Sequence, residues 1–181
     1  MRTQADIIGF IDSQPQMTAI LAEVASFNCP DCWVGAGFLR NAVWDALHSR
    51  PWSTDESDID VVYFGATDVN PTAEARLEEI LGRLSPRPWS VKNQARMHHR
   101  NGDAPYLDTQ DAVSHWLETC TAVAVRRLHG RVEVMAPFGW GDLLGLIIRP
   151  TPPGLRKPDE FQERVTWKRW LTRWPKLRLA Q

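Results

Sequence analysis

The chain has 181 residues, a formal net charge of −1, 43% hydrophobic residues and 24% charged residues. This length fits one ordinary domain, and the composition excludes an intrinsically disordered chain. A net charge near zero provides no overall attraction to nucleic acid or membranes, so any such binding must come from a local patch. No apolar run approaches the roughly 20 residues that span a bilayer, and the N-terminal residues lack the pattern of a signal peptide. We therefore expect a cytoplasmic protein without membrane segments.

Hydrophobic residues at helical spacing predict a helix over residues 4–27, which Pro15 breaks into two pieces. A short apolar strand is expected over residues 32–35, and a helix over residues 38–48. A polar loop leads to a strand at residues 59–64 that is rich in β-branched residues. The next elements are a helix over residues 71–84 and a strand over residues 89–97.

In the second half, residues 109–117 predict a short helix, and residues 121–128 and 131–135 predict a β-hairpin. A short helix at 142–148 and a proline-rich linker at 149–158 precede a final helix at 161–174. In that helix Trp167, Trp170 and Trp174 share one face, which predicts packing on the core. This order implies an α+β fold with a mixed β-sheet packed by helices. We expect residues 1–150 to form the domain and residues 151–181 to form a C-terminal helical extension packed on it.

Two aspartates open the strand at residues 59–64. Because side chains alternate across a strand, Asp58 and Asp60 point to the same face, about 7 Å apart at their Cα atoms. Two such carboxylates repel each other, and a divalent cation relieves that repulsion. Mg²⁺, or Mn²⁺ in its place, suits them because it prefers oxygen ligands and shares its other positions with water and phosphate. Solvated acids at a strand end are the alternative for an isolated pair.

A small-residue turn joins the first predicted strand to the next helix. The backbone N–H groups of Gly35, Ala36 and Gly37, with the N-terminus of that helix, suit a phosphate anion. An ordinary strand–helix turn is the alternative. Arg40 follows on the helix, where its guanidinium could reach a phosphate or pair with Asp45.

Polar residues downstream could complete a site. Glu133 lies in an alternating apolar strand, where an inward carboxylate needs a partner such as a metal held by the two aspartates. A third carboxylate would complete a two-metal phosphoryl-transfer site, whereas an outward Glu133 would face solvent. Lys92 and Asn93 either line a base or acceptor pocket or lie on an exposed edge strand.

The run Val34–Asn41, followed by Ser57–Val62, resembles the signature of the DNA polymerase beta-like nucleotidyltransferase superfamily, in its tRNA-CCA-adding and poly(A)-polymerase branch. Over residues 15–175 the chain is also similar to small bacterial nucleotidyltransferase-like proteins. Two features depart from the superfamily pattern. Ala36 stands at the first position of the usual glycine pair, and the stretch from Gly37 to Asp58 is longer.

The resemblance implies that Asp58 and Asp60 ligate Mg²⁺ and that Gly37 and its neighbours, with Ser57, contact a triphosphate. Glu133 matches the third carboxylate, which activates the acceptor hydroxyl. The implied reaction transfers a nucleotide from an NTP to a hydroxyl of a small molecule, an RNA or a protein, and releases pyrophosphate. A competing hypothesis is a non-catalytic nucleotide-binding or interaction protein that retains the fold. The sequence indicates neither the acceptor nor the oligomeric state.

Two further features allow more than one interpretation. Cys29 and Cys32 form a C-x-x-C pair, which suits half a zinc site, a redox pair or two loop cysteines before a strand. Residues 149–181 contain nine Lys or Arg and three acidic residues, a local charge of 9 − 3 = +6. This surplus either attracts an NTP tail or an RNA acceptor or forms a solvated basic face.

Overall fold

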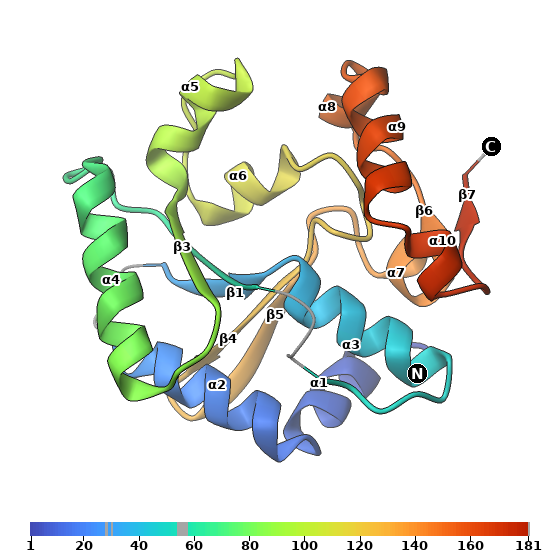
Figure 1. Cartoon of the computed structure of the whole chain (residues 1–181), viewed down its shortest axis with the longest axis horizontal. Coiled ribbons are helices and arrows are strands. Elements are labelled where there is room, and N and C mark those ends of the chain that lie inside the picture. Colours follow the sequence, from blue (N-terminus) through green and yellow to red (C-terminus); the bar gives the residue numbers. More distant parts are fainter. Residues whose placement is uncertain (28, 30, 54–57, 181) are drawn as a thin grey trace.

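The computed structural model describes residues 1–27, 29, 31–53 and 58–180. A five-stranded sheet with the strand order β3-β2-β1-β4-β5 lies at its centre (Figure 1). The strands are β1 (Trp33–Gly35), β2 (Ile59–Tyr63), β3 (Trp89–Asn93), β4 (Ala124–Leu128) and β5 (Arg131–Met135). β2 and β3 are parallel, whereas the β1–β2, β1–β4 and β4–β5 pairs are antiparallel. The mixed sheet and its helices confirm the predicted α+β fold.

One face of the sheet forms the main hydrophobic core. Its side chains include Val34, Val61, Val91 and Val125, which are in register across four strands. The helices α1 (Gln4–Asp12), α2 (Pro15–Ala25) and α4 (Pro71–Leu84) pack on this face. α2 begins at Pro15, so the predicted break in the first helix is confirmed.

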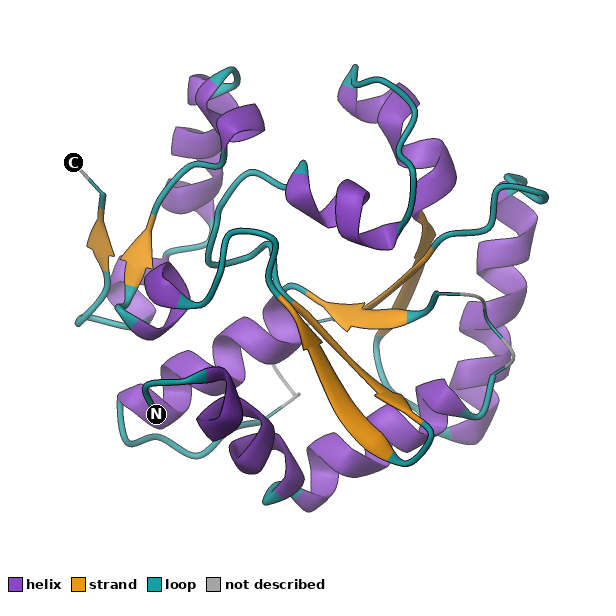
Figure 2. Cartoon of the chain, turned by 180° about the vertical axis from the view of Figure 1, so that it is seen from behind, coloured by secondary structure: helices purple, strands orange, loops and turns teal. Residues whose placement is uncertain are grey.

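The opposite face of the sheet packs against a different helix. Trp33, Val62 and Ala124 on this face pack against Val113 of α6 (Thr109–Ser114). α3 (Gly37–Leu47) begins immediately after β1, and Figure 2 shows the two layers of helices on either side of the strands. No helix in the described part of the chain is long and apolar enough to cross a membrane.

The strand predicted over residues 89–97 ends at Asn93. The Asn93 side chain accepts a hydrogen bond from Ala95 N–H and so caps a 3₁₀ turn, η1 (Gln94–Arg96), which leads into α5 (Met97–Asn101). This local side-chain hydrogen bond competes with further strand pairing. The strand is therefore shorter than the sequence pattern predicted.

The C-terminal segment contains more elements than the sequence predicted. They are α7 (Gly141–Leu144), β6 (Ile147–Ile148), α8 (Pro152–Leu155), α9 (Pro158–Trp167), α10 (Trp170–Arg173) and β7 (Arg178–Leu179). α8 lies in the expected linker, and β6 pairs with β7 in a separate two-stranded sheet (Figure 2).

The single helix predicted over residues 161–174 is in fact two helices. Arg169 has a φ of 51°, in the left-handed region, which interrupts a right-handed helix. Trp170 and Trp174 are 2% and 1% exposed and pack edge-on against Trp44, whereas Trp167 is 75% exposed. The predicted common face was therefore wrong for Trp167, because the turn at Arg169 separates it from the other two.

This difference in burial predicts a difference in stability. Trp170→Ala should lower the free energy of unfolding by about 3–5 kcal/mol, since it leaves a large cavity in the core. Trp167→Ala, made as the matched control, should change it by less than about 0.5 kcal/mol. Urea denaturation followed by circular dichroism measures both values, and equal losses would contradict the described packing of the C-terminal segment.

Candidate functional site

The two aspartates lie at the start of β2, next to the turn that follows β1. Asp60 pairs in register with Ser90 of β3, whose side chain acts to lower the pKa of the Asp60 carboxyl. The β1–β2 register pairs Val34 with Val61, and its continuation places Gly35 beside Asp60. Asp58 is exposed and immediately precedes β2, while Asp60 is half-buried. The structure therefore brings the aspartate pair and the small-residue turn together.

The electrostatics around Asp60 favour the approach of a cation. Burial raises the pKa of Asp60 above its ordinary value, and the negative charge of Asp58 raises it further. The hydrogen bond from Ser90 and the charges of Arg40 and Lys168 act in the opposite direction. Two neighbouring carboxylates, one of them open to solvent, offer hard oxygen donors of the kind that Mg²⁺ and Mn²⁺ prefer.

The turn between β1 and α3 is held in an unusual conformation. Ala36 has a φ of 48° and a ψ of −119°, which an L-residue adopts only with strain and glycine adopts freely. This is the position where the superfamily pattern has its first glycine. A Cβ added to Gly35 would lie 2.7 Å from the Trp116 ring, so Gly35 allows close packing there. A Cβ on Gly37 would lie 3.6 Å from Arg40 Nη2, which is an ordinary contact.

Arg40 lies beneath this turn rather than in solvent. It is 5% exposed and donates hydrogen bonds to Asn41 Oδ1 at 2.9 Å and to Thr121 Oγ1 at 2.9 Å. Its guanidinium also lies 4.5 Å from the centre of the Trp170 ring. Burial lowers the pKa of Arg40 to about 10, so the group stays charged at neutral pH. Arg40 therefore supplies a fixed positive charge behind the glycine turn, and Asp45 instead accepts a hydrogen bond from Trp174.

The structure does not bring Glu133 to the aspartates. Glu133 lies on β5, which β1 and β4 separate from β2. Its carboxylate bonds Arg126 at 2.7 Å, and Arg126 is its partner in register across the hairpin. The residue of β5 in the row of Gly35 and Ala124 is Met135. The partner of the Glu133 carboxylate is therefore Arg126 and not a metal held by the two aspartates. Among the described residues no group of three His, Cys, Asp or Glu side chains could hold a metal ion.

Lys92 and Asn93 have structural partners near α4 and the loop after β2. Lys92 Nζ lies 3.2 Å from Glu78 of α4 and also bonds the carbonyl of Val91. Asn93 is 1% exposed and binds the loop after β2. Its side chain accepts a hydrogen bond from Gly65 N–H and donates one to the Gly65 carbonyl. Ser57, also expected to contact the nucleotide, lies outside the described residues.

Sequence reasoning missed several residues that the fold brings to the site. Glu118, which is 0% exposed, lies 2.8 Å from Arg164 of α9, and Lys168 at the end of α9 lies within the electrostatic influence of both aspartates. Ser90 and Thr121 also belong to this neighbourhood. The net positive charge of residues 149–181 was the one sequence signal for a cation such as Lys168 near the aspartates. Nothing in the local sequence pattern indicated that Glu118 is buried.

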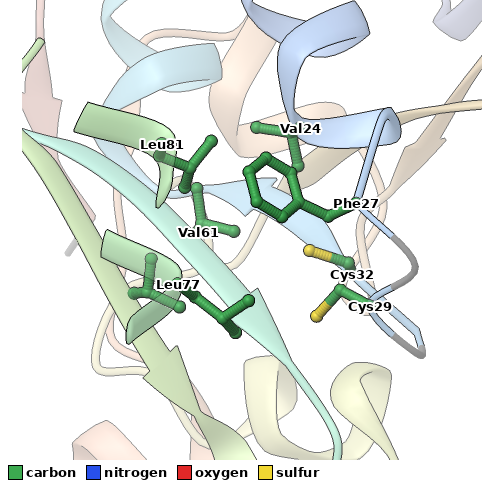
Figure 3. Close-up of a pocket in the computed structure, with 8 residues that line it drawn as sticks. Val24, Phe27, Cys29, Cys32, Val61, Leu77 and Leu81 are labelled. Atoms are coloured by element: carbon green, nitrogen blue, oxygen red, sulfur yellow. The ribbon is translucent and has the colours of Figure 1, made fainter. Parts of the chain in front are cut away.

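The C-x-x-C pair lies on the other side of the sheet, on the main-core face. Figure 3 shows Cys29 and Cys32 close together at one end of a small apolar pocket with Val24, Phe27 and Val61. A hydrogen bond between the thiols lowers the pKa of Cys29 and raises that of Cys32, which burial raises further. A zinc site needs further ligands, and the described residues provide no third one there.

Comparisons with known proteins agree with this arrangement. A family model described as Nucleotidyltransferase matches residues 22–179. A solved structure described as revealing a CCA-adding enzyme head domain is 31% identical, has a TM-score of 0.89, and is matched over 100% of this chain and 97% of that one. A search of curated proteins gives no match.

Larger enzymes share the fold at lower identity. A CCA-adding enzyme in complex with CTP has 15% identity and a TM-score of 0.61, over 99% of this chain and 44% of that one. The Thermotoga maritima CCA-adding enzyme complexed with tRNA has 16% identity and a TM-score of 0.59, over 99% and 43%. The chain thus spans less than half the length of these enzymes.

The fold and its aspartate-bearing strand match the nucleotidyltransferase fold of that CCA-adding enzyme head domain. The chain belongs to the nucleotidyltransferase family whose model matches it.

The strain at Ala36 predicts a stabilising substitution. Ala36→Gly should raise the free energy of unfolding by about 1 kcal/mol. Glycine adopts this positive φ without strain, and the strain relieved exceeds the extra conformational entropy that glycine loses on folding. Ala42→Gly in the middle of α3 is the control and should lower it by about 1 kcal/mol or more. Urea denaturation measures both values. Loss of stability in Ala36→Gly would contradict the described turn.

The raised pKa of Asp60 predicts a pH-dependent effect on stability. Burial disfavours the ionised Asp60 carboxylate in the folded state. The ionised form therefore lowers the free energy of unfolding at pH values above the raised pKa of Asp60. This effect is absent at pH values below the ordinary pKa of 3.8. In buffer containing EDTA, Asp60→Asn should therefore have a higher Tm than the native chain at pH 7. This difference should shrink as the pH falls toward 3. Thermal melts across this range test the sign, and a lower Tm for the variant at pH 7 would contradict it.

Proposed function

We propose that the chain is a Mg²⁺-dependent nucleotidyltransferase, with Mn²⁺ as a substitute, that uses an NTP to modify a hydroxyl acceptor. The acceptor oxygen forms a bond to the α-phosphorus, the bond from that phosphorus to the β-phosphate oxygen breaks, and pyrophosphate leaves. The hydroxyl proton passes to solvent. The observation that carries this proposal is the position of Asp58 and Asp60 beside the Gly35–Gly37 turn.

The donor set fits the cation that this chemistry needs. Asp58 is open to solvent and Asp60 half-buried, so both can present oxygen atoms toward a cation while water or phosphate takes its other positions. When bound, the cation neutralises charge on the attacking and leaving oxygens. We leave Glu133 out of the proposed ligand set because Arg126 neutralises it on a distant strand.

The chain's own residues would orient the nucleotide. The first turn of α3 leaves N–H groups at Gly37 and Phe38 without acceptors in the helix, and such groups bind phosphate oxygens. Arg40 adds a fixed positive charge behind that turn and does not need to reach the ligand. Ser90, the partner of Asp60 in register on β3, favours the ionised form of the Asp60 carboxyl that a cation needs.

The relatives suggest which substrates to test first. CCA-adding enzymes that share the fold have been solved with CTP, with ATP and with tRNA. CTP and ATP are therefore the first donors to test, and RNA is the first class of acceptor. A small molecule or a protein stays an alternative acceptor.

Label transfer tests the proposal. Purified native chain is incubated with α-³²P-labelled CTP or ATP, Mg²⁺ and either RNA or a desalted cell extract. We expect transfer by the native chain and a loss of about 100-fold or more in Asp58→Asn and Asp60→Asn, because each removes a ligand of the cation. Glu133→Gln is the matched carboxylate control and should keep most of the activity.

The controls separate the possible outcomes. Equal label transfer by the native chain and both Asp variants would reject the proposed site. Binding of Mg²⁺–NTP without transfer to any acceptor would instead favour a non-catalytic nucleotide-binding protein.

A further inference from the structure

The end of α9 brings a positive charge to the aspartates from a distant part of the chain. Lys168 follows α9 directly and is exposed. The charges of Asp60 and Asp58 both act on its ammonium, as do those of Arg164 and Arg40. In the described part of the chain Lys168 makes no direct ion pair with a carboxylate. It is thus a cation near the acidic pair that is still available to a ligand.

Several buried contacts fix this end of α9 against the beginning of α3. Arg164, one turn before Lys168, lies 2.8 Å from the fully buried Glu118. Trp170, two residues after Lys168, is buried and stacks on Arg40 at 4.5 Å. Arg40 in turn bonds Thr121. In Figure 1, α9 and α10 lie on the same side of the molecule as α3. The contacts of Arg164, Trp170 and Arg40 hold the two helices there.

The local conformation and a neighbouring ring restrict the Lys168 side chain. Arg169 adopts the left-handed conformation, so the chain turns sharply between Lys168 and Trp170. The Lys168 ammonium lies 4.6 Å from the centre of the exposed Trp167 ring. A cation over an aromatic face is attracted to it, so Trp167 restricts an otherwise flexible side chain. Of the two cations whose charges act on Lys168, Arg40 is buried and Arg164 is paired with Glu118.

We propose that Lys168 binds the β- and γ-phosphates of the nucleotide and the pyrophosphate that they become. This inference rests on the proposed function, because the aspartates and the turn at Gly37 must first bring the triphosphate to this place. Charge builds on the leaving pyrophosphate as its bond to the α-phosphorus breaks, and an ammonium group nearby stabilises that charge. The C-terminal segment would therefore be part of the active site as well as of the core.

Binding of pyrophosphate and of CTP or ATP, measured by isothermal titration calorimetry with Mg²⁺ at pH 7.5, tests this role without turnover. Lys168→Met should weaken pyrophosphate binding about 10-fold or more, the usual effect of losing a hydrogen bond to a charged group. Lys168→Arg keeps the charge and should bind within about threefold of the native chain. Arg178→Met, in the exposed strand β7 of the same segment, is the control and should bind as the native chain does. Thermal melts confirm that all variants are folded.

The outcomes separate this inference from the proposed function. If the native chain binds neither Mg²⁺–NTP nor pyrophosphate, the proposed function fails. If the native chain binds both and Lys168→Met binds pyrophosphate equally well, only the role of Lys168 is overturned. Tighter Mg²⁺ binding by Lys168→Met with unchanged pyrophosphate affinity would show that Lys168 is a counter-ion of the aspartates, which also overturns it.

Discussion

The repulsion between Asp58 and Asp60 is the constraint on which the site depends. One carboxylate is exposed at the start of β2 and the other is half-buried on the sheet, so burial and like charge act together on Asp60. A fold gains no stability from such a pair, and the surrounding positive charges offset its repulsion only in part. An arrangement that costs stability and provides hard oxygen donors is typical of a site kept for its chemistry.

Arg40 connects this acidic pair to the rest of the molecule. Its guanidinium bonds Thr121 ahead of β4, stacks on Trp170 of α10 and lies behind Gly37. A buried arginine with this many partners resists movement, because any shift leaves a charged group or its acceptors without hydrogen bonds. The position of the C-terminal segment and the charge behind the glycine turn therefore depend on the same side chain.

The sequence predicted the parts of the fold that local patterns determine, including the helix break at Pro15, the bounds of α4 and the β4–β5 hairpin. The resemblance to a known superfamily implied that the aspartates and the glycine turn share one site, because both motifs belong to its signature. Glu133 shows the limit of such reasoning, since alternation gives the face of a residue but not the order of strands in the sheet. Lys168 was missed for a similar reason, because the left-handed Arg169 and the Glu118–Arg164 pair depend on tertiary contacts.

The most direct test of the central claim is to locate the cation. A crystal of the chain soaked with MnCl₂ and a non-hydrolysable CTP or ATP analogue would be measured at the manganese absorption edge. The account predicts an anomalous peak between the carboxylates of Asp58 and Asp60, with the triphosphate against the first turn of α3. A triphosphate bound elsewhere, or no manganese at these two carboxylates, would contradict it.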